Sequence, residues 1–174
     1  MASYKEIVTK TVIGKSKKTI KDKVKIMPEQ NPSTVLGCWV INHEFSGSVT
    51  NNKAHVNGSY DVNVWYSYDQ DHKTAVTQKT YTYSDELNVN IKNNQTLSNN
   101  TEIIVRSLKQ PTVSDVKING SEIDLTIEKE LGVEIVGEAK IKVPIEDDFD
   151  DYEEIIDEES IDEIIEEIEP EYLK

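Results

Sequence analysis

The chain has 174 residues, of which 36% are hydrophobic, with a formal net charge of -14 and a single cysteine. This length suffices for one domain with a real core plus an appendage, and one cysteine excludes an internal disulfide framework and cysteine-rich zinc modules. The N-terminal residues lack the continuous apolar stretch of a signal peptide, and no segment approaches the roughly twenty apolar residues of a transmembrane helix. We therefore expect a protein kept in a reducing, cytoplasmic compartment.

The charge is distributed unevenly along the chain. Residues 146–174 contain 16 acidic residues and one lysine, a net charge of -15, which leaves a net charge of +1 for residues 1–145. Residues 1–25 hold eight lysines and two acidic residues. Opposite charges at the two ends can pair between neighbouring chains, so head-to-tail assembly is one interpretation. We expect no nucleic-acid partner, because the lysines lack an accompanying recognition helix, phosphate-binding loop or set of stacking aromatics.

The first two elements in chain order are a segment that fits either a helix or a strand and a segment that fits a strand. Residues 4–14 fit either a helical stripe or a β-strand, because their apolar residues are mostly β-branched. Residues 19–28 alternate between lysines and a second set of side chains, which predicts a strand that ends at Pro28. The face opposite the lysines consists of Ile20, Asp22, Val24 and Ile26.

Residues 36–45, LGCWVINHEF, are flanked by turn-forming residues and are predicted to form a buried strand. They contain Cys38 and His43, the residue types of a thiol nucleophile and its base. Side chains of a strand alternate between its faces, which would place these two on opposite sides of a sheet. We therefore expect Cys38 to be a buried, unreactive core residue and His43 a polar residue near the strand end, with no catalytic residues.

The next segments predict a hairpin. Residues 55–68 alternate as a long half-buried strand, and Asp69 to His72 form a polar turn before a second strand over residues 73–91, with a break expected near residues 84–86. The inward face of the first strand is predicted to consist of Tyr60, Val62, Val64, Tyr66 and Tyr68. Tyrosine-rich faces favour cross-strand packing over ligand stacking.

The remaining body also alternates with period two. Two short apolar runs, residues 103–108 and 113–118, precede Asn119-Gly120, which is predicted to be a two-residue hairpin turn. Apolar side chains then alternate with charged ones over residues 123–143, with a bulge expected at Gly137. Eight or so short strands predict a mainly β fold, a single antiparallel β-sandwich-like domain over residues 1–145.

Residues 146–174 form an acidic amphipathic tail. Isoleucines recur at helical spacing, Ser160 and Glu163 match a capping box, and Pro170 ends the run. We expect the isolated tail to be disordered or partly helical, because its carboxylates repel one another, and to become helical on a partner with an apolar groove and a basic rim. A merely solubilising tail is the alternative. The predicted protein-interaction residues are Ile161, Ile164, Ile165, Ile168, Glu163, Glu167, Tyr172 and Leu173.

Several motifs carry a resemblance to a known family. They are PSTVLGCWVINHEF, VNGSYDVNVWYSYD, TAVTQKTYTY, IIVRSLKQPT, EIVGEAKIKV and the Pro-Glu-Tyr-Leu ending of the acidic tail. In this order they resemble the outer spore-coat morphogenetic protein E (CotE) family of endospore-forming bacteria. The resemblance implies a non-enzymatic scaffold without cofactor or metal, made in the mother-cell cytoplasm during sporulation and deposited on the forespore surface. It also implies self-assembly as a homo-oligomer and recruitment of other spore-coat proteins to the outer layer.

Two other function classes fit parts of the sequence. A β-sandwich with Trp65, Tyr66, Tyr68, Tyr81 and Tyr83 matches a carbohydrate-binding module, provided that these aromatics lie exposed in one plane. An enzyme using Cys38 would need a polar pocket beside the thiol and a reactive thiolate.

Overall fold

We describe the fold from a computed structural model, which describes residues 3–51, 53–91 and 101–145. All regular elements in these ranges are strands. They are β1 (Ser3–Ile26), β2 (Pro32–Thr50), β3 (Lys53–Tyr68), β4 (Lys73–Asn88), β5 (Asn90–Ile91), β6 (Glu102–Asn119) and β7 (Glu122–Ile145). The predicted mainly β fold is confirmed, and residues 4–14, which were compatible with helix or strand, lie in β1.

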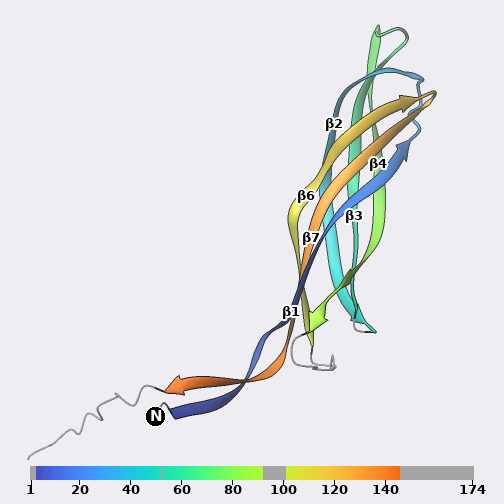
Figure 1. Ribbon diagram of the computed structural model, residues 1–174. Coiled ribbons are helices and arrows are strands. Elements are labelled where there is room, and N and C mark those ends of the chain that lie inside the picture. Colours follow the sequence, from blue (N-terminus) through green and yellow to red (C-terminus); the bar gives the residue numbers. More distant parts are fainter. Residues whose placement is uncertain (1–2, 52, 92–100, 146–174) are drawn as a thin grey trace, which may run out of the picture. The chain divides into compact units, whose positions relative to one another are not determined.

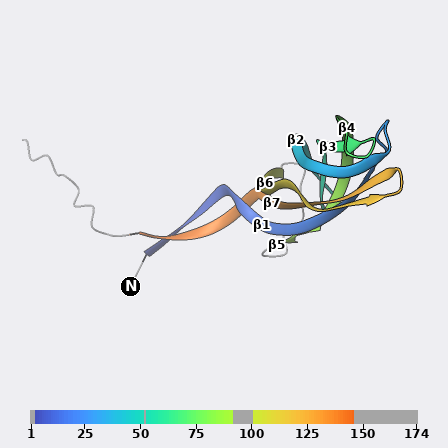
Figure 2. The same ribbon diagram turned by 90° about the horizontal axis from the view of Figure 1, so that it is seen from above.

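The strands form two antiparallel sheets that pack face to face (Figures 1 and 2). The first sheet has the order β5-β1-β7-β6, and the second has the order β2-β3-β4. The β5 strand follows β4 directly in the chain but pairs with β1, so the chain switches sheets at this edge. The sandwich-like architecture is therefore as predicted, although its strands are fewer and longer.

The described chain divides into two units. Residues 8–139 form the larger one, which contains both sheets and the hydrophobic core. Residues 3–7 and 140–145, the first residues of β1 and the last of β7, belong to the other unit. Side chains there, such as Tyr4 and Ile141, are exposed.

The core lies between the inner faces of the two sheets and follows the predicted alternation. The buried apolar residues of β3 include Tyr60, Val62, Val64 and Tyr66, and those of β7 are Ile123, Leu125, Ile127, Leu131, Val133 and Ile135. Each set repeats at every second position, so one face of each strand packs inward. Burial of these side chains supplies the main driving force for folding.

The β2 strand departs from the prediction in two respects. It is half-buried rather than buried, with Leu36, Trp39 and Ile41 each more than two-fifths exposed. Its alternation is also interrupted at three register shifts, and the last one, the bulge between Ile41 and Glu44, contains Asn42 with a positive φ of 55°. The extra residue reverses the faces that follow, since a shift of one position moves every later side chain to the other side.

The bulge overturns the predicted separation of Cys38 from His43. Cys38 and Phe45 both pack against the core, and His43 contacts the inward-facing Tyr83, so the three side chains share the inner face of β2. Cys38 is half-buried rather than fully buried. The prediction that sequence alternation keeps the thiol and the imidazole on opposite faces is therefore wrong.

Both predicted hairpins are present, but their turns and pairing differ in part from the prediction. The turn after β3 lies at Asp69 to His72, as predicted, but β4 pairs with β3 without interruption, so the break expected near residues 84–86 is absent from this pair. The turn between β6 and β7 consists of Gly120 and Ser121, one residue later than predicted, and Gly120 has a φ of 62°.

The two apolar runs predicted between residues 103 and 118 form one strand, β6, which carries the register shifts of the β6–β7 pair. Gly137, where a bulge was expected, packs closely against the core. A Cβ atom at this position would lie 2.8 Å from Cδ1 of Ile13. The glycine thus allows β7 to approach the Ile13 side chain.

We predict that Gly58→Ala destabilises the fold by about 1 to 3 kcal/mol, because overpacking forces atoms of a close-packed region apart. An added Cβ would lie 2.6 Å from the backbone oxygen of Glu44 and against the phenol of Tyr83. Gly37→Ala is the matched control, since its Cβ would meet only Trp65, at 3.8 Å. Urea denaturation of both variants measures the difference, and equal stabilities would contradict the close approach at Gly58.

Candidate functional site

A buried ionic cluster joins the two sheets. Lys129 of β7 has no exposed surface, and its Nζ lies 2.5 Å from Oδ2 of Asp22 in β1 and 3.2 Å from Oδ2 of Asp85 in β4. The side chains of Asp22 and Asp85 are 8% and 15% exposed. Removing one member of a buried ion pair costs about 3 to 5 kcal/mol, because the remaining charge loses its partner.

Two tyrosines enclose this cluster. The Tyr60 hydroxyl donates a hydrogen bond of 2.7 Å to Oδ2 of Asp22, and Nζ of Lys129 lies 3.9 Å from the ring centroid of Tyr83. Burial raises the pKa of both phenols above the ordinary tyrosine value, and the neighbouring carboxylates raise the pKa further. Both hydroxyls are therefore protonated at neutral pH and act as donors.

His43 extends the polar network to β6. Its Nε2 lies 2.7 Å from the Tyr83 hydroxyl and its Nδ1 lies 3.0 Å from Oε1 of Gln110. A neutral ring fits these partners when Nδ1–H donates to the Gln110 oxygen and Nε2 accepts from the Tyr83 hydroxyl. Burial lowers the pKa of His43, and the charge of Lys129 lowers it further, against the opposing effect of the Gln110 hydrogen bond.

The sequence indicated only part of this cluster. Asp22 was placed on the inward face of its strand by the alternation of residues 19–28. Lys129 was missed, although it stands between Ile127 and Leu131 at the same odd positions that carry the core of β7. The sequence feature that could have identified Lys129 is a charged residue at a position where the alternation predicts an inward, apolar one. Asp85 was missed because the predicted break in β4 removed it from the pattern.

Cys38 lies in an environment that disfavours nucleophilic chemistry. Burial raises the pKa of its thiol above the ordinary value, which lowers the fraction of reactive thiolate. Both ring nitrogens of His43, the candidate base, are engaged by Gln110 and Tyr83. The geometry thus favours a packing role for Cys38.

The outer side of the β2-β3-β4 sheet carries an exposed hydrophobic surface, which we call the apolar face. Its residues, each between 42% and 58% exposed, are Leu36, Trp39, Ile41, Trp65 and Val76. Strand pairing brings them together, because Trp65 lies opposite Gly37 and Val76, and Trp39 lies opposite Asn63. The Asn63 side chain is 93% buried, and its Nδ2 has no hydrogen-bond acceptor within the described residues.

The aromatic row required for carbohydrate binding is not arranged as one exposed plane. Tyr66 and Tyr83 are buried, and Tyr68 and Tyr81 are half-buried and pack against the core. Of the five candidate aromatics only Trp65 is exposed. The packing interpretation of the tyrosines is therefore the one that the structure supports.

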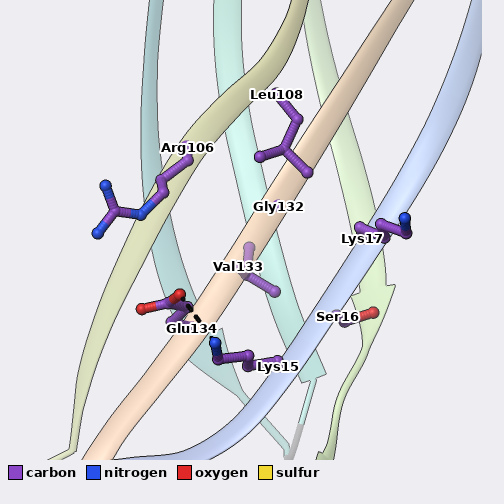
Figure 3. A pocket seen from close by; sticks show the side chains of 8 residues that line it. All are labelled: Lys15, Ser16, Lys17, Arg106, Leu108, Gly132, Val133 and Glu134. Atoms are coloured by element: carbon purple, nitrogen blue, oxygen red, sulfur yellow. Dashed lines mark ion pairs between the residues drawn. The ribbon is translucent and has the colours of Figure 1, made fainter.

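The other sheet carries an open, cationic groove of about 460 Å³, shown in Figure 3. Lys15 and Lys17 of β1 line this groove together with Arg106 and the exposed Leu108 of β6, and Leu108 lies against Gly132 of β7. Glu134 partly neutralises this rim through an ion pair of 3.5 Å with Lys15. Cations around an apolar side chain fit an acidic segment with apolar residues.

The predicted interaction residues of the tail lie outside the described residues. They are Ile161, Ile164, Ile165, Ile168, Glu163, Glu167, Tyr172 and Leu173. Within the described ranges no helix is long and apolar enough to cross a membrane. The same ranges contain no group of three or more histidine, cysteine or acidic side chains arranged to hold a metal ion.

Comparison with known proteins identifies the family. The family model for outer spore coat protein E (CotE) matches residues 3–174, nearly the whole chain. The chain belongs to the CotE family. This membership confirms the resemblance carried by the sequence motifs and supports a spore-coat role, in a structural family rather than a known enzyme family. No curated protein and no solved structure matches the chain.

We predict that His43 contributes to the pH dependence of stability. Because its pKa is lowered in the folded state, the unfolded chain binds the proton more readily, and stability falls as the pH drops below the unfolded value of about 6.5. The melting temperature of the unaltered protein should therefore decrease more between about pH 7.5 and about pH 5.5 than that of His43→Gln. Equal decreases would show that this imidazole is not coupled to folding.

Proposed function

We propose that this chain is a non-enzymatic structural and morphogenetic scaffold of the bacterial spore coat, which self-assembles and recruits outer-coat proteins. It is made in the mother-cell cytoplasm during sporulation and deposited around the forespore. Membership in the CotE family over residues 3–174 supports the coat role. In this proposal residues 1–145 act as the coat domain and residues 146–174 as the recruiting tail.

The main structural support for self-assembly is the exposure of the apolar face. Soluble monomers rarely expose large contiguous hydrophobic patches, and such patches commonly mark contact surfaces. Here two exposed tryptophans, Trp39 and Trp65, lie on adjacent strands, and Val76 lies opposite Trp65. A second copy of the chain that packs the same face against this one would bury both tryptophans.

The acidic tail and the cationic groove have complementary charges. The groove combines Lys15, Lys17 and Arg106 with Leu108. The tail combines carboxylates with four isoleucines at helical spacing, which we call the isoleucine stripe: Ile161, Ile164, Ile165 and Ile168. This complementarity supports recruitment of partners through the tail and a contact between the tail of one copy and the groove of the next. Such electrostatic contacts steer association and weaken as salt rises.

We predict that the double variant Trp39→Ser/Trp65→Ser self-associates less than the unaltered chain. Both side chains lie on the outer side of their sheet, so the core and the melting temperature should be little affected. Ile104→Ser is the matched control, because Ile104 is comparably exposed but lies on β6 in the other sheet. Size-exclusion chromatography with light scattering measures the assemblies.

For this test, the control should keep the assembly size of the unaltered chain. An unaltered chain that is monomeric, or a tryptophan variant that assembles as the unaltered chain does, would reject the apolar face as the self-association surface.

We predict that replacing the four stripe residues with serine abolishes capture of coat proteins from sporulating-cell extract, even at low salt. The positions are Ile161, Ile164, Ile165 and Ile168. The substitutions retain every charge, so a tail that acts only as a solubiliser would be unaffected. Docking, in contrast, depends on the apolar contact for affinity.

A charge variant serves as the matched control for the stripe. In it, glutamine replaces Glu158, Glu159, Glu163, Glu166 and Glu167. Its association should be slower and less dependent on salt, while the apolar contact still forms. Equal recovery of coat proteins by the serine variant and the unaltered protein would contradict recruitment through the isoleucine stripe.

A further inference from the structure

The buried ionic cluster has a composition that a scaffold function does not require. An amine, Nζ of Lys129, lies 2.5 Å from one carboxyl group and 3.2 Å from a second, all within the core of the sandwich. Other amine–carboxylate pairs are nearly as short but exposed, such as Lys53 with Glu86 at 2.6 Å. The cluster is thus distinguished by its burial and by its second carboxyl group.

Burial changes the chemistry open to this pair. In water an amine and a carboxyl group remain as solvated ions, which do not react with each other. In an apolar core both charged forms lose hydration, so transfer of the proton from Nζ to the carboxylate yields a neutral amine and a neutral carboxyl group. A neutral amine held against a carboxyl group is a nucleophile at an effective concentration of about 10⁵ to 10⁸ M in well-oriented cases.

We propose that Lys129 and Asp22 condense into an intramolecular isopeptide bond that links β7 to β1, with Asp85 as the proton carrier. The Nζ lone pair forms a bond to Cγ of Asp22, and one carbon–oxygen bond of that carboxyl group breaks. The ammonium and carboxylate together become one amide and one water molecule. No oxidation or reduction occurs, so the reaction needs no co-reactant.

Each neighbouring side chain has a role in this step. Oδ2 of Asp85 lies at ion-pair distance from Nζ but outside hydrogen-bond geometry, and it has no hydrogen-bond partner within the described residues. It is therefore free to accept a proton from Nζ as the new bond forms and to pass it toward the departing oxygen, which leaves as water. Asp85 ends the reaction in its starting state.

Tyr60 is placed to stabilise the intermediate. Its hydroxyl donates to Oδ2 of Asp22 at 2.7 Å, the oxygen that receives the proton from Nζ, and this hydrogen bond stabilises the negative charge that Oδ2 gains as it departs. The ring of Tyr83 covers Nζ at 3.9 Å on another side. These aromatic groups also hold water away from the amine, which favours loss of water from the intermediate over its return.

The proposed bond would join positions 107 residues apart in the sequence. The two strands are neighbours in the first sheet, so the amide would fit between adjacent strands without rearranging the topology. A covalent link of this length constrains the unfolded chain strongly. It would keep the core of a scaffold protein closed under conditions that unfold non-covalent sandwiches.

The test is the intact mass of the full, purified chain, measured under denaturing conditions. We expect the unaltered protein to be lighter than its sequence by one water molecule, and a protease digest to yield one branched peptide containing Asp22 and Lys129. The variants Lys129→Met and Asp22→Ala should have their full sequence masses. A full-mass unaltered protein would overturn the proposal, since this measurement does not depend on any variant folding.

Two further variants separate this bond from other dehydrations. Lys53→Met removes an exposed ion pair and should still lose one water, whereas a water loss that persists in Lys129→Met would assign the dehydration to another site and reject the bond. Asp85→Asn should keep its full mass while its circular dichroism remains that of a folded β protein. Loss of water from Asp85→Asn at the unaltered rate would remove Asp85 from the mechanism.

Discussion

The contact of Lys129 with Asp22 and Asp85 is the constraint on which the packing of the two sheets depends. Lys129 and Asp22 belong to the first sheet, and Asp85 belongs to the second. An unpaired charge in an apolar core costs several kcal/mol, so a sandwich that displaced one sheet along the other would lose that amount on separating these groups. Tyr60 and Tyr83 add directional contacts to the same point. The apolar residues around them supply the driving force, while the charges select one arrangement.

The inner faces of both sheets pack in the core, and the two outer faces expose side chains of different kinds. The outer side of β2-β3-β4 exposes Trp39 and Trp65, whereas the groove on the other sheet exposes Lys15, Lys17 and Arg106. The proposed contacts with copies of the chain and with other coat proteins would use separate surfaces, with apolar burial supplying affinity and charge supplying steering.

Much of this fold follows from the sequence, and the exceptions have physical causes. Period-two alternation sufficed to place Tyr60 and Ile123 inward and to locate the hairpins, because each strand has one apolar face. It failed at β2, because the bulge at Asn42, which has a positive φ, reverses the faces of the residues that follow. The local sequence did not predict this bulge. The ionic cluster was beyond single-strand patterns, since its members come from three strands and are recognised as partners only when the sheets pack. Lys129 was nevertheless detectable as a charge in an otherwise apolar register.

The double-mutant cycle of Lys129→Met and Asp85→Asn, measured by urea denaturation, tests most directly whether this cluster couples the two sheets. Each single change should lower the free energy of unfolding by about 3 to 5 kcal/mol, because it leaves a buried group without its partner. The double variant should lose less than the sum of the two by at least about 1 kcal/mol, since residues in contact are not additive. Strict additivity would contradict the account, because it would mean that Lys129 and Asp85 do not act on one another between the two sheets.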